Sequence, residues 1–127
     1  MARKAARKAH APYSGYRVGA ALVAEDGTVF TGCNVENVAY GSTMCAERVA
    51  LYKAVSEGRR RFVALALAAG TDTAGVPCGA CLQALGEFCD SAMPVVCATL
   101  ARGAGSMRAF TLRDLLPESF TLRRYTL

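Results

Sequence analysis

The sequence predicts an α/β fold: a three-layer α/β/α sandwich around a mixed five-stranded sheet. The clearest sign is Phe62–Ala69 (FVALALAA), a continuous apolar run typical of a strand that is buried on both faces. Helix-like segments precede and follow this run, and strands that alternate with helices favour a sheet covered by helices. With 127 residues, 53% of them hydrophobic, the chain is long enough to bury a core, and we expect residues 1–127 to form a single domain.

Before the central strand, the sequence predicts a short helix and a β-hairpin. Residues 2–10 (ARKAARKAH) contain good helix formers and precede a proline that would end a helix. Arg17–Ala24 and Thr28–Val35 are candidate strands, because the Glu-Asp-Gly sequence between them is a hairpin turn signal. Residues 36–44 are rich in turn-forming residues and predict a loop.

Two longer helices flank the central strand in the sequence. The first is predicted from about Cys45 to Glu57, with Gly58 as its C-terminal cap, and the second from about Cys78 to Cys89 after a loop. Shorter elements complete the prediction. These are a strand at Val95–Leu100, a turn at Arg102–Ser106, a strand at Met107–Phe110 and a capped helix at Thr111–Leu116. The two helix starts should meet at one end of the central strands, where such folds place their sites.

Composition and charge exclude several classes of protein. No apolar run reaches the roughly 20 residues of a membrane-spanning helix, and residues 1–11 are too basic for a signal peptide, so we expect a cytoplasmic protein without a membrane partner. The net charge is +5, and nine of the 15 basic residues lie in three clusters that we interpret as solvated surface: Arg3–Lys8, Arg59–Arg61 and Arg123–Arg124. Nucleic acid is therefore not an expected partner.

Three of the six cysteines lie at turn–helix junctions and are candidate metal ligands: Cys45, Cys78 and Cys81. Six cysteines are too few for a disulfide-stapled secreted domain, and clustered cysteines in a reducing compartment more often bind metal. The remaining cysteines lie singly in apolar stretches, and we expect them to be buried: Cys33, Cys89 and Cys97. A Cys-x-x-Cys pair at a helix N-terminus presents two thiols one turn apart, and the positive helix end favours the thiolates that zinc needs.

Glu47 lies two residues after Cys45, in the first turn of the first long helix. The apolar stripe of this helix, extended back by three and four residues from Ala50 and Leu51, includes Glu47 and turns it toward the interior. Favourable interaction with the helix dipole explains most first-turn carboxylates. Here the inward phase and the neighbouring cysteine favour a functional role, in which the carboxylate moves protons at a metal site without binding the metal.

The ligand count favours an open metal site. His10, the one histidine, lies in the basic N-terminal segment, where we expect it to be exposed, so no fourth protein ligand is evident. A three-thiolate zinc site retains a position for water but is formally negative, and that charge opposes water activation. Arg48 and the helix N-termini could draw charge from the sulfurs, although Arg48 could equally be an ordinary surface arginine.

These residues also carry a family resemblance. Cys45-Ala46-Glu47 together with Pro77-Cys78-Gly79-Ala80-Cys81 match the pattern of zinc-dependent nucleoside and nucleobase deaminases. The surrounding motifs APYSGYRVGAAL, TGCNVENVAYG, CAER and LLPESF resemble the small, homotetrameric cytidine deaminases from about Ala11 to Phe120. The resemblance implies a cytidine deaminase-like fold with one Zn²⁺ per subunit. It also implies the hydrolytic deamination of cytidine and 2′-deoxycytidine to uridine and 2′-deoxyuridine, with release of ammonia, in pyrimidine salvage.

The resemblance also implies roles for substrate-binding residues. Asn34 and Glu36 would bind the ribose hydroxyls, and Tyr16 stands where the family usually has a phenylalanine beside the substrate. The backbone at Ala46 would contact the base, and Phe120 would cover the pyrimidine ring in a neighbouring subunit's pocket.

Arg48 matches the family arginine that hydrogen-bonds the zinc thiolates, so the resemblance favours a functional role for it. Leu82 departs from the pattern, because many relatives have arginine after the second cysteine of Cys-x-x-Cys. One donor to the thiolates would then be missing.

Two other functions remain open. The first is a deaminase for another substrate, such as an aminoacyl-nucleoside antibiotic or a polynucleotide. The NVEN segment favours a free nucleoside over these, and the sequence lacks clear basic tracks with stacking aromatic residues. The second is a non-catalytic zinc module. The inward-facing Glu47 and the absence of an evident fourth ligand argue against it.

Overall fold

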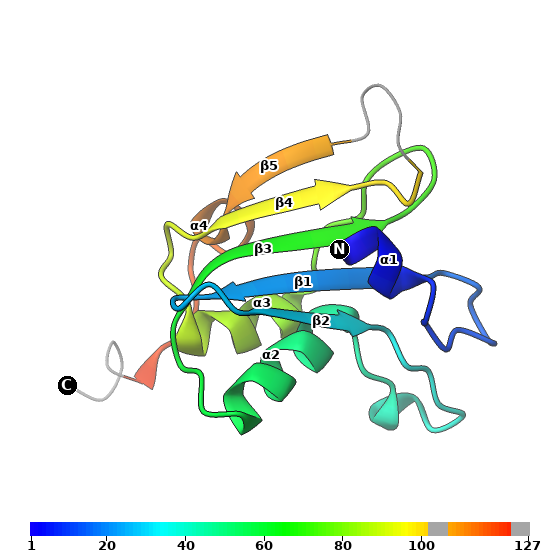
Figure 1. The fold of residues 1–127 in the computed structure, drawn as a ribbon, viewed down its shortest axis with the longest axis horizontal. Coiled ribbons are helices and arrows are strands. Elements are labelled where there is room, and N and C mark those ends of the chain that lie inside the picture. The colour runs from blue at the N-terminus through cyan, green and yellow to red at the C-terminus, as the bar shows by residue number, and fades with distance from the viewer. Residues whose placement is uncertain (102–106, 123–127) are drawn as a thin grey trace.

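The computed structural model describes residues 1–101 and 107–122, which form a mixed five-stranded sheet with helices on both faces (Figure 1). The strands lie in the order β2-β1-β3-β4-β5, so β3 is central. Their bounds are Val18–Ala24 (β1), Val29–Cys33 (β2), Phe62–Ala69 (β3), Pro94–Ala98 (β4) and Met107–Thr111 (β5). The predicted mixed five-stranded sheet is confirmed.

The strand directions follow from the connections. β1 and β2 form an antiparallel hairpin, β1 is also antiparallel to β3, and β4 is antiparallel to β5. β3 and β4 are parallel, and the helix α3 lies between them in the chain. Parallel neighbours need such a crossover connection, which returns the chain to the same end of the sheet.

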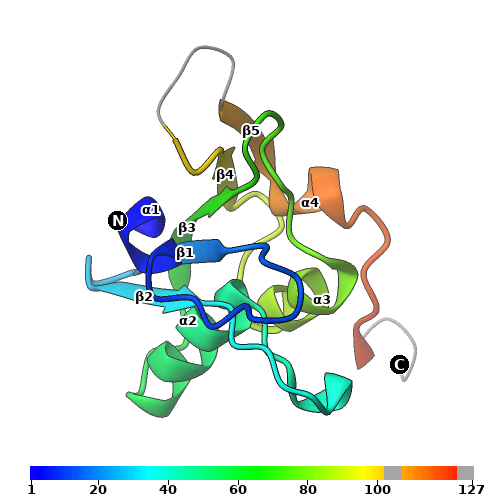
Figure 2. The same ribbon diagram turned by 90° about the vertical axis from the view of Figure 1, so that its right-hand side faces the viewer.

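Helices cover the two faces unequally. Their bounds are Ala2–Ala6 (α1), Ala46–Ser56 (α2), Gly79–Phe88 (α3) and Leu112–Leu115 (α4), with a 3₁₀ turn at Tyr40–Ser42. Figures 1 and 2 show α2 and α3 against one face of the sheet and the short α1 on the other, which makes the three predicted layers. No helix in the described part of the chain is both long and apolar enough to cross a membrane.

The face under α2 and α3 carries the main core. Leu22, Leu51, Leu65 and Leu85 are fully buried there, and each such side chain stabilises the fold by about 1.5–3 kcal/mol. Close packing of α2 depends on small residues: a Cβ atom added at Gly32 would lie 2.5 Å from the Ala46 carbonyl oxygen. This close approach fixes the start of α2 directly over the sheet, where its first-turn side chains face the core.

Several predicted ends of helices and strands are wrong by a residue or a few, and the largest error is at the C-terminal end of the first helix, predicted over residues 2–10. It ends at Ala6 instead of residue 10, because the chain must turn to bring His10 beside β2. There the His10 amide donates to the Asn34 carbonyl and the Glu36 amide donates to the His10 carbonyl. β2 itself ends at Cys33, so the predicted strand Thr28–Val35 is shorter than expected, although the Asn34 amide still donates to the Val18 carbonyl of β1 at 3.2 Å.

Other expectations are met in part. The capping box of α4 is confirmed, with Thr111 and Asp114 each accepting a hydrogen bond from the other's backbone amide. Cys97 is buried as predicted, whereas Cys33 and Cys89 are partly exposed. The predicted turn at 102–106 and the basic pair at 123–124 lie outside the described residues.

Candidate active site

Three cysteine thiols converge where the starts of α2 and α3 meet. Cys45 is the N-cap of α2, Cys78 is the N-cap of α3, and Cys81 lies in the first turn of α3. The Cys45 and Cys78 Sγ atoms are 3.8 Å apart, those of Cys78 and Cys81 are 3.5 Å apart, and all three lie within 4.8 Å of one another. Tetrahedral zinc with bonds of about 2.3 Å separates its sulfur ligands by about 3.8 Å. The cluster therefore fits one zinc ion, and the expectation that the two helix starts meet is confirmed.

One arginine and two helix N-termini place positive charge beside the thiols. The cluster lies at the N-termini of two helices, whose aligned peptide dipoles favour thiolates. Arg48 donates from Nη2 to Cys45 Sγ at 3.5 Å, so it is not an ordinary surface arginine. Hydrogen bonds first from Cys81 and then from Arg48 lower the pKa of Cys45, and the bond to Cys45 raises the pKa of Arg48, which keeps the guanidinium charged.

Glu47 is buried beside this cluster, with 3% of its surface exposed. The inward phase predicted for it is confirmed. Burial is the main cause that raises the pKa of its carboxyl group, and the neighbouring Cys45 charge adds to the effect. The pKa of Cys81 is raised by its hydrogen bond to Cys45, by burial and by the Glu47 charge, which is consistent with a carboxylate close to the thiols. A carboxylate so placed can exchange protons with a group held at the metal.

Asn34 and Glu36 hold the N-terminal turn in place. Asn34 is 8% exposed; its Oδ1 accepts from the Val18 amide at 2.9 Å and its Nδ2 donates to the Tyr16 carbonyl at 2.8 Å. Glu36 accepts hydrogen bonds from the backbone amides of residues 13 and 14 and from the Ser14 hydroxyl. The Ser14 hydroxyl is the main cause that lowers the pKa of Glu36. The two residues predicted to contact ribose thus also position the Tyr16 segment.

The other predicted substrate residues lie on two separate elements. Tyr16 is 48% exposed, and its hydroxyl lies over Gly75, in the loop that leads to Cys78. Ala46 is fully buried in the first turn of α2, directly after Cys45. Phe120 is 54% exposed, beyond α4.

Gln83 belongs to the surroundings of the site, although no sequence pattern singled it out. It lies two residues after Cys81 on the exposed side of α3. Its Nε2 donates to the Phe120 carbonyl at 3.0 Å. Leu82, where many relatives have arginine, is 6% exposed and packs into the core, so it offers the thiols no donor.

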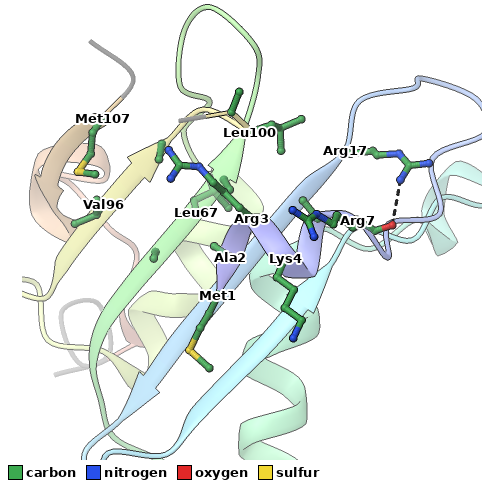
Figure 3. Close-up of a pocket in the computed structure, with 15 residues that line it drawn as sticks. Met1, Ala2, Arg3, Lys4, Arg7, Arg17, Leu67, Val96, Leu100 and Met107 are labelled. Atoms are coloured by element: carbon green, nitrogen blue, oxygen red, sulfur yellow. Dashed lines mark hydrogen bonds between the residues drawn. The ribbon is translucent and has the colours of Figure 1, made fainter. Parts of the chain in front are cut away.

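A cavity of about 750 Å³ lies away from these residues, between α1 and the strands β3 and β4 (Figure 3). Its floor is apolar, and its rim carries Arg3, Lys4, Arg7 and Arg17, with an Arg17 Nη1 to Arg7 carbonyl hydrogen bond of 3.1 Å. None of its lining residues is a cysteine, a histidine or a carboxylate. The groups needed for metal-assisted deamination are therefore gathered at the cysteine cluster and not in this cavity.

Comparison with known proteins agrees with this chemistry. Residues 1–99 match the family described as "Cytidine and deoxycytidylate deaminase zinc-binding region". The chain is 50% identical over 119 residues to a cytidine deaminase of Sporosarcina psychrophila. The aligned residues make up 94% of this chain and 85% of that protein. It is 48% identical over 113 residues to the cytidine deaminase of Halalkalibacterium halodurans, covering 89% of this chain and 83% of the relative.

A solved structure also shares the fold. The crystal structure of cytidine deaminase from Burkholderia pseudomallei superposes with a TM-score of 0.86 at 45% sequence identity, covering 94% of this chain and 93% of that one. The agreement therefore extends from the cysteine motifs to the arrangement of the whole sheet and its helices. With its three-thiol zinc site and the matching family pattern over residues 1–99, the chain belongs to the zinc-binding cytidine and deoxycytidylate deaminase family.

Proposed function

We propose that this protein hydrolytically deaminates cytidine and 2′-deoxycytidine to uridine and 2′-deoxyuridine, with release of ammonia, as a step of pyrimidine salvage. The observation that carries the proposal is the buried Glu47 beside three thiols that fit one zinc ion. The similarity to proteins named cytidine deaminase, at 48–50% identity over most of the chain, supports this choice of substrate.

Cys45, Cys78 and Cys81 would hold one zinc ion per subunit. When bound, zinc supplies a Lewis acid that brings the pKa of a water molecule to about 7. Three thiolates would weaken this effect through their negative charge. Arg48 and the two helix N-termini offset that charge, and the 3.5 Å contact from Arg48 to Cys45 supports this role.

Glu47 would move the protons. Its carboxylate accepts a proton from the attacking water while a C–O bond forms at C4 of cytosine, and it delivers that proton to N3. It then takes the remaining proton from the new C4 hydroxyl and passes it to the amino group, so that the C4–N bond breaks, ammonia leaves and the C4 carbonyl of uridine forms. A carboxyl group whose pKa is raised by burial suits this exchange, because it accepts and returns protons more evenly near neutral pH.

The nucleoside would lie between the cluster and the N-terminal turn. Asn34 and Glu36 would hydrogen-bond the ribose hydroxyls, Tyr16 would pack beside the substrate, and backbone groups at Ala46 would contact the base. The position of the Tyr16 hydroxyl over the loop before Cys78 supports this arrangement, because it brings the turn toward the metal loop.

We also propose a homotetramer in which Phe120 of one subunit covers the pyrimidine in another. Large apolar side chains are exposed in the loop before Cys45, where Val38 is 79% and Tyr40 is 88% exposed, and Phe120 is 54% exposed. Large apolar side chains that stay this exposed are candidates for burial against a partner subunit. A monomer would then be poorly active.

The cytoplasm is the compartment we propose. All six cysteines are free thiols, and three of them form the candidate zinc site. A reducing compartment keeps such thiols available to metal. We propose no nucleic-acid partner.

Ultraviolet-monitored loss of the amino group tests the function. The zinc-quantified protein is incubated with a panel of cytosine nucleosides, nucleotides and aminoacyl-nucleoside analogues, and ammonia is measured in parallel. We expect cytidine and 2′-deoxycytidine to be deaminated with one ammonia per nucleoside. Zinc-replete protein that releases ammonia from no cytosine nucleoside would instead be a non-catalytic zinc module, and activity confined to the aminoacyl analogues would identify a different deaminase.

A further inference from the structure

The two carboxylate oxygens of Glu36 are held in different ways. Oε1 accepts two backbone hydrogen bonds, from the Tyr13 amide at 2.9 Å and from the Ser14 amide at 3.1 Å. In the described part of the chain, Oε2 accepts one hydrogen bond, from the Ser14 hydroxyl. The two bonds to Oε1 fix the position of that oxygen but let the carboxylate turn about it. The direction of Oε2 therefore depends on the Ser14 hydroxyl.

The proton of this hydroxyl is directed toward Glu36. Ser14 Oγ also accepts a hydrogen bond from the Tyr16 amide at 3.0 Å. An N–H group is a donor only, so it occupies a lone pair of the hydroxyl oxygen and cannot receive the hydroxyl proton. The lowered pKa of Glu36 keeps its carboxyl group ionised at neutral pH, and an ionised carboxylate is an acceptor only. The donor and acceptor roles of all three groups therefore agree with a Ser14 to Glu36 hydrogen bond.

The same hydroxyl connects the two residues that would bind the ribose. Asn34 Nδ2 donates to the Tyr16 carbonyl at 2.8 Å, and the Tyr16 amide donates to Ser14 Oγ. Ser14 in turn donates to Glu36, so a continuous series of contacts runs from Asn34 to Glu36. Side chains supported in this way are held at a fixed separation, which the recognition of two hydroxyl groups on one sugar requires.

One acceptor position of Glu36 remains for a ligand. An ionised carboxylate offers about four lone-pair sites, and the three hydrogen bonds from Tyr13 and Ser14 occupy two on Oε1 and one on Oε2. The remaining site lies on Oε2, the oxygen that the Ser14 hydroxyl contacts. A sugar hydroxyl can donate a hydrogen bond there, whereas a sugar carbon without a hydroxyl cannot.

We propose that Ser14 is a positioning residue for ribose recognition: its hydroxyl directs Glu36 Oε2 toward the sugar hydroxyl that donates to it. The inference rests on the proposed function, in which Glu36 binds the ribose. The competing explanation is that the hydroxyl only stabilises the N-terminal turn through Tyr16. That turn has supports that do not use the hydroxyl, because the Gly15 amide donates to the Ala11 carbonyl at 2.9 Å and two further amides bind Glu36.

Serine variants separate the hydroxyl from the rest of the side chain. Ser14 is exposed, so Ser14→Ala removes the hydroxyl without opening a cavity, and Ser14→Thr keeps it. Ser56→Ala is the matched control. Ser56 is also exposed, and its hydroxyl donates to the Lys53 carbonyl at 2.8 Å, at the opposite end of α2 from Cys45.

Steady-state kinetics on cytidine, 2′-deoxycytidine and 3′-deoxycytidine form the first part of the test. We expect Ser14→Ala to raise KM for cytidine about three- to tenfold with kcat changed less than about twofold, because a lost sugar contact weakens ground state and transition state alike. Ser14→Thr and Ser56→Ala should match the wild type in both constants, and zinc content should stay at the wild-type value in every variant. A nucleoside that turns over too slowly is measured as a competitive inhibitor of cytidine deamination.

The two deoxynucleosides show whether Ser14 acts through Glu36. One of them lacks the hydroxyl that Glu36 binds, and Glu36→Gln should affect its KM least. We expect Ser14→Ala to leave the KM of that same nucleoside unchanged while it raises the KM of the other two. An equal rise for all three nucleosides, a rise for none, or a Ser14→Thr protein as impaired as Ser14→Ala would overturn the inference.

Calorimetric titration with cytidine is the second part and separates binding from turnover. It uses zinc-matched Glu47→Gln protein, which lacks the proton-transfer carboxylate, so that cytidine persists in the site. We expect Ser14→Ala, added to this variant, to raise the Kd for cytidine by the same factor as it raises KM. An unchanged Kd would overturn the inference, because the hydroxyl would then have no effect on nucleoside binding.

Failure of the proposed function gives different results from failure of the inference. A zinc-replete wild type that deaminates none of the three nucleosides rejects the proposed function, and the inference falls with it. If Glu36→Gln raises the KM of all three equally, the ribose contact of Glu36 is wrong, and the inference falls although deamination stands. If Glu36→Gln spares one deoxynucleoside and Ser14→Ala does not, the inference about Ser14 alone is rejected.

Discussion

The Sγ atoms of Cys45 and Cys78 lie 3.8 Å apart although 33 residues separate them in the sequence. Each is the N-cap of a different helix, so the separation records how α2 and α3 are packed against the sheet. A metal bound here joins two helices and also completes the site. Metal binding should therefore affect both stability and activity.

Metal removal is the first prediction. A strong chelator should abolish cytidine deamination and lower the thermal unfolding midpoint, because a ligand that binds only the folded state stabilises it. Added zinc should restore both. Calorimetry and the ultraviolet assay check this, with Cys89→Ser as a control that leaves the three-thiol cluster intact. Full activity in chelated protein with no detectable zinc would contradict the account.

Arg48 gives a second prediction. Arg48→Gln removes the positive charge 3.5 Å from Cys45 while keeping a shorter, polar side chain with N–H donors. We expect deamination or zinc affinity to fall by about 10- to 100-fold, as is typical when a partner of a metal ligand is lost. Steady-state kinetics and a competitive zinc titration measure the two effects. Arg59→Gln, at an arginine that pairs with Asp26 on the surface, should leave both unchanged.

The contact between Tyr16 and Gly75 predicts a suppressor. A methyl group at Gly75 would lie 2.5 Å from the Tyr16 hydroxyl oxygen but 3.7 Å from the ring carbon that bears it. Gly75→Ala should therefore displace the ring and raise KM, and Tyr16→Phe should relieve this clash in the double variant, leaving the 3.1 Å approach of the new methyl group to Ala69 Cβ. We expect a coupling of about 1 kcal/mol in kcat/KM.

The measurement for this prediction is a double-mutant cycle on cytidine kinetics. Tyr16→Phe alone serves as the reference and should remain close to the wild type. Strictly additive effects of the two substitutions would show that the hydroxyl does not control the loop before Cys78.

Glu36 predicts a pH dependence of stability. Hydrogen bonds from Ser14 and from the backbone lower its pKa in the folded protein. A carboxyl group with a lowered folded pKa contributes stability above its unfolded pKa, and this contribution disappears as the pH falls through the folded value. The free energy of unfolding of the wild type should thus exceed that of Glu36→Gln at neutral pH, and the difference should shrink in acid.

Urea unfolding of both proteins between about pH 3 and pH 7 checks this, with chelator present throughout so that zinc loss does not contribute. A difference that does not change with pH would show that the loss comes from altered packing and not from the charge on Glu36.

The sequence predicted the parts of the molecule that local periodicity determines. The phase of α2 placed Glu47 inward, because that phase depends on residues within one or two turns of a helix. The apolar runs and the turn signals between them predicted the five strands and their order along the chain in the same way.

The errors arose where distant contacts override local preference. Residues 7–10 have helix-forming sequences, yet pairing between His10 and Val35 ends α1 early. The backbone contacts of Asn34 and the bond from Gln83 to Phe120 join segments 16 to 37 residues apart. Such contacts depend on how loops pass one another in space. The spacing of residues within a single helix or strand does not predict them.

Proton transfer by Glu47 is the central claim, and Glu47→Gln tests it most directly. The substitution keeps the shape of the side chain beside the cysteine cluster and removes its ability to exchange protons. With zinc content matched to the wild type, we predict that kcat for cytidine falls by at least about 10²-fold, measured as the loss of cytidine absorbance. Wild-type turnover in a zinc-replete Glu47→Gln protein would contradict the account.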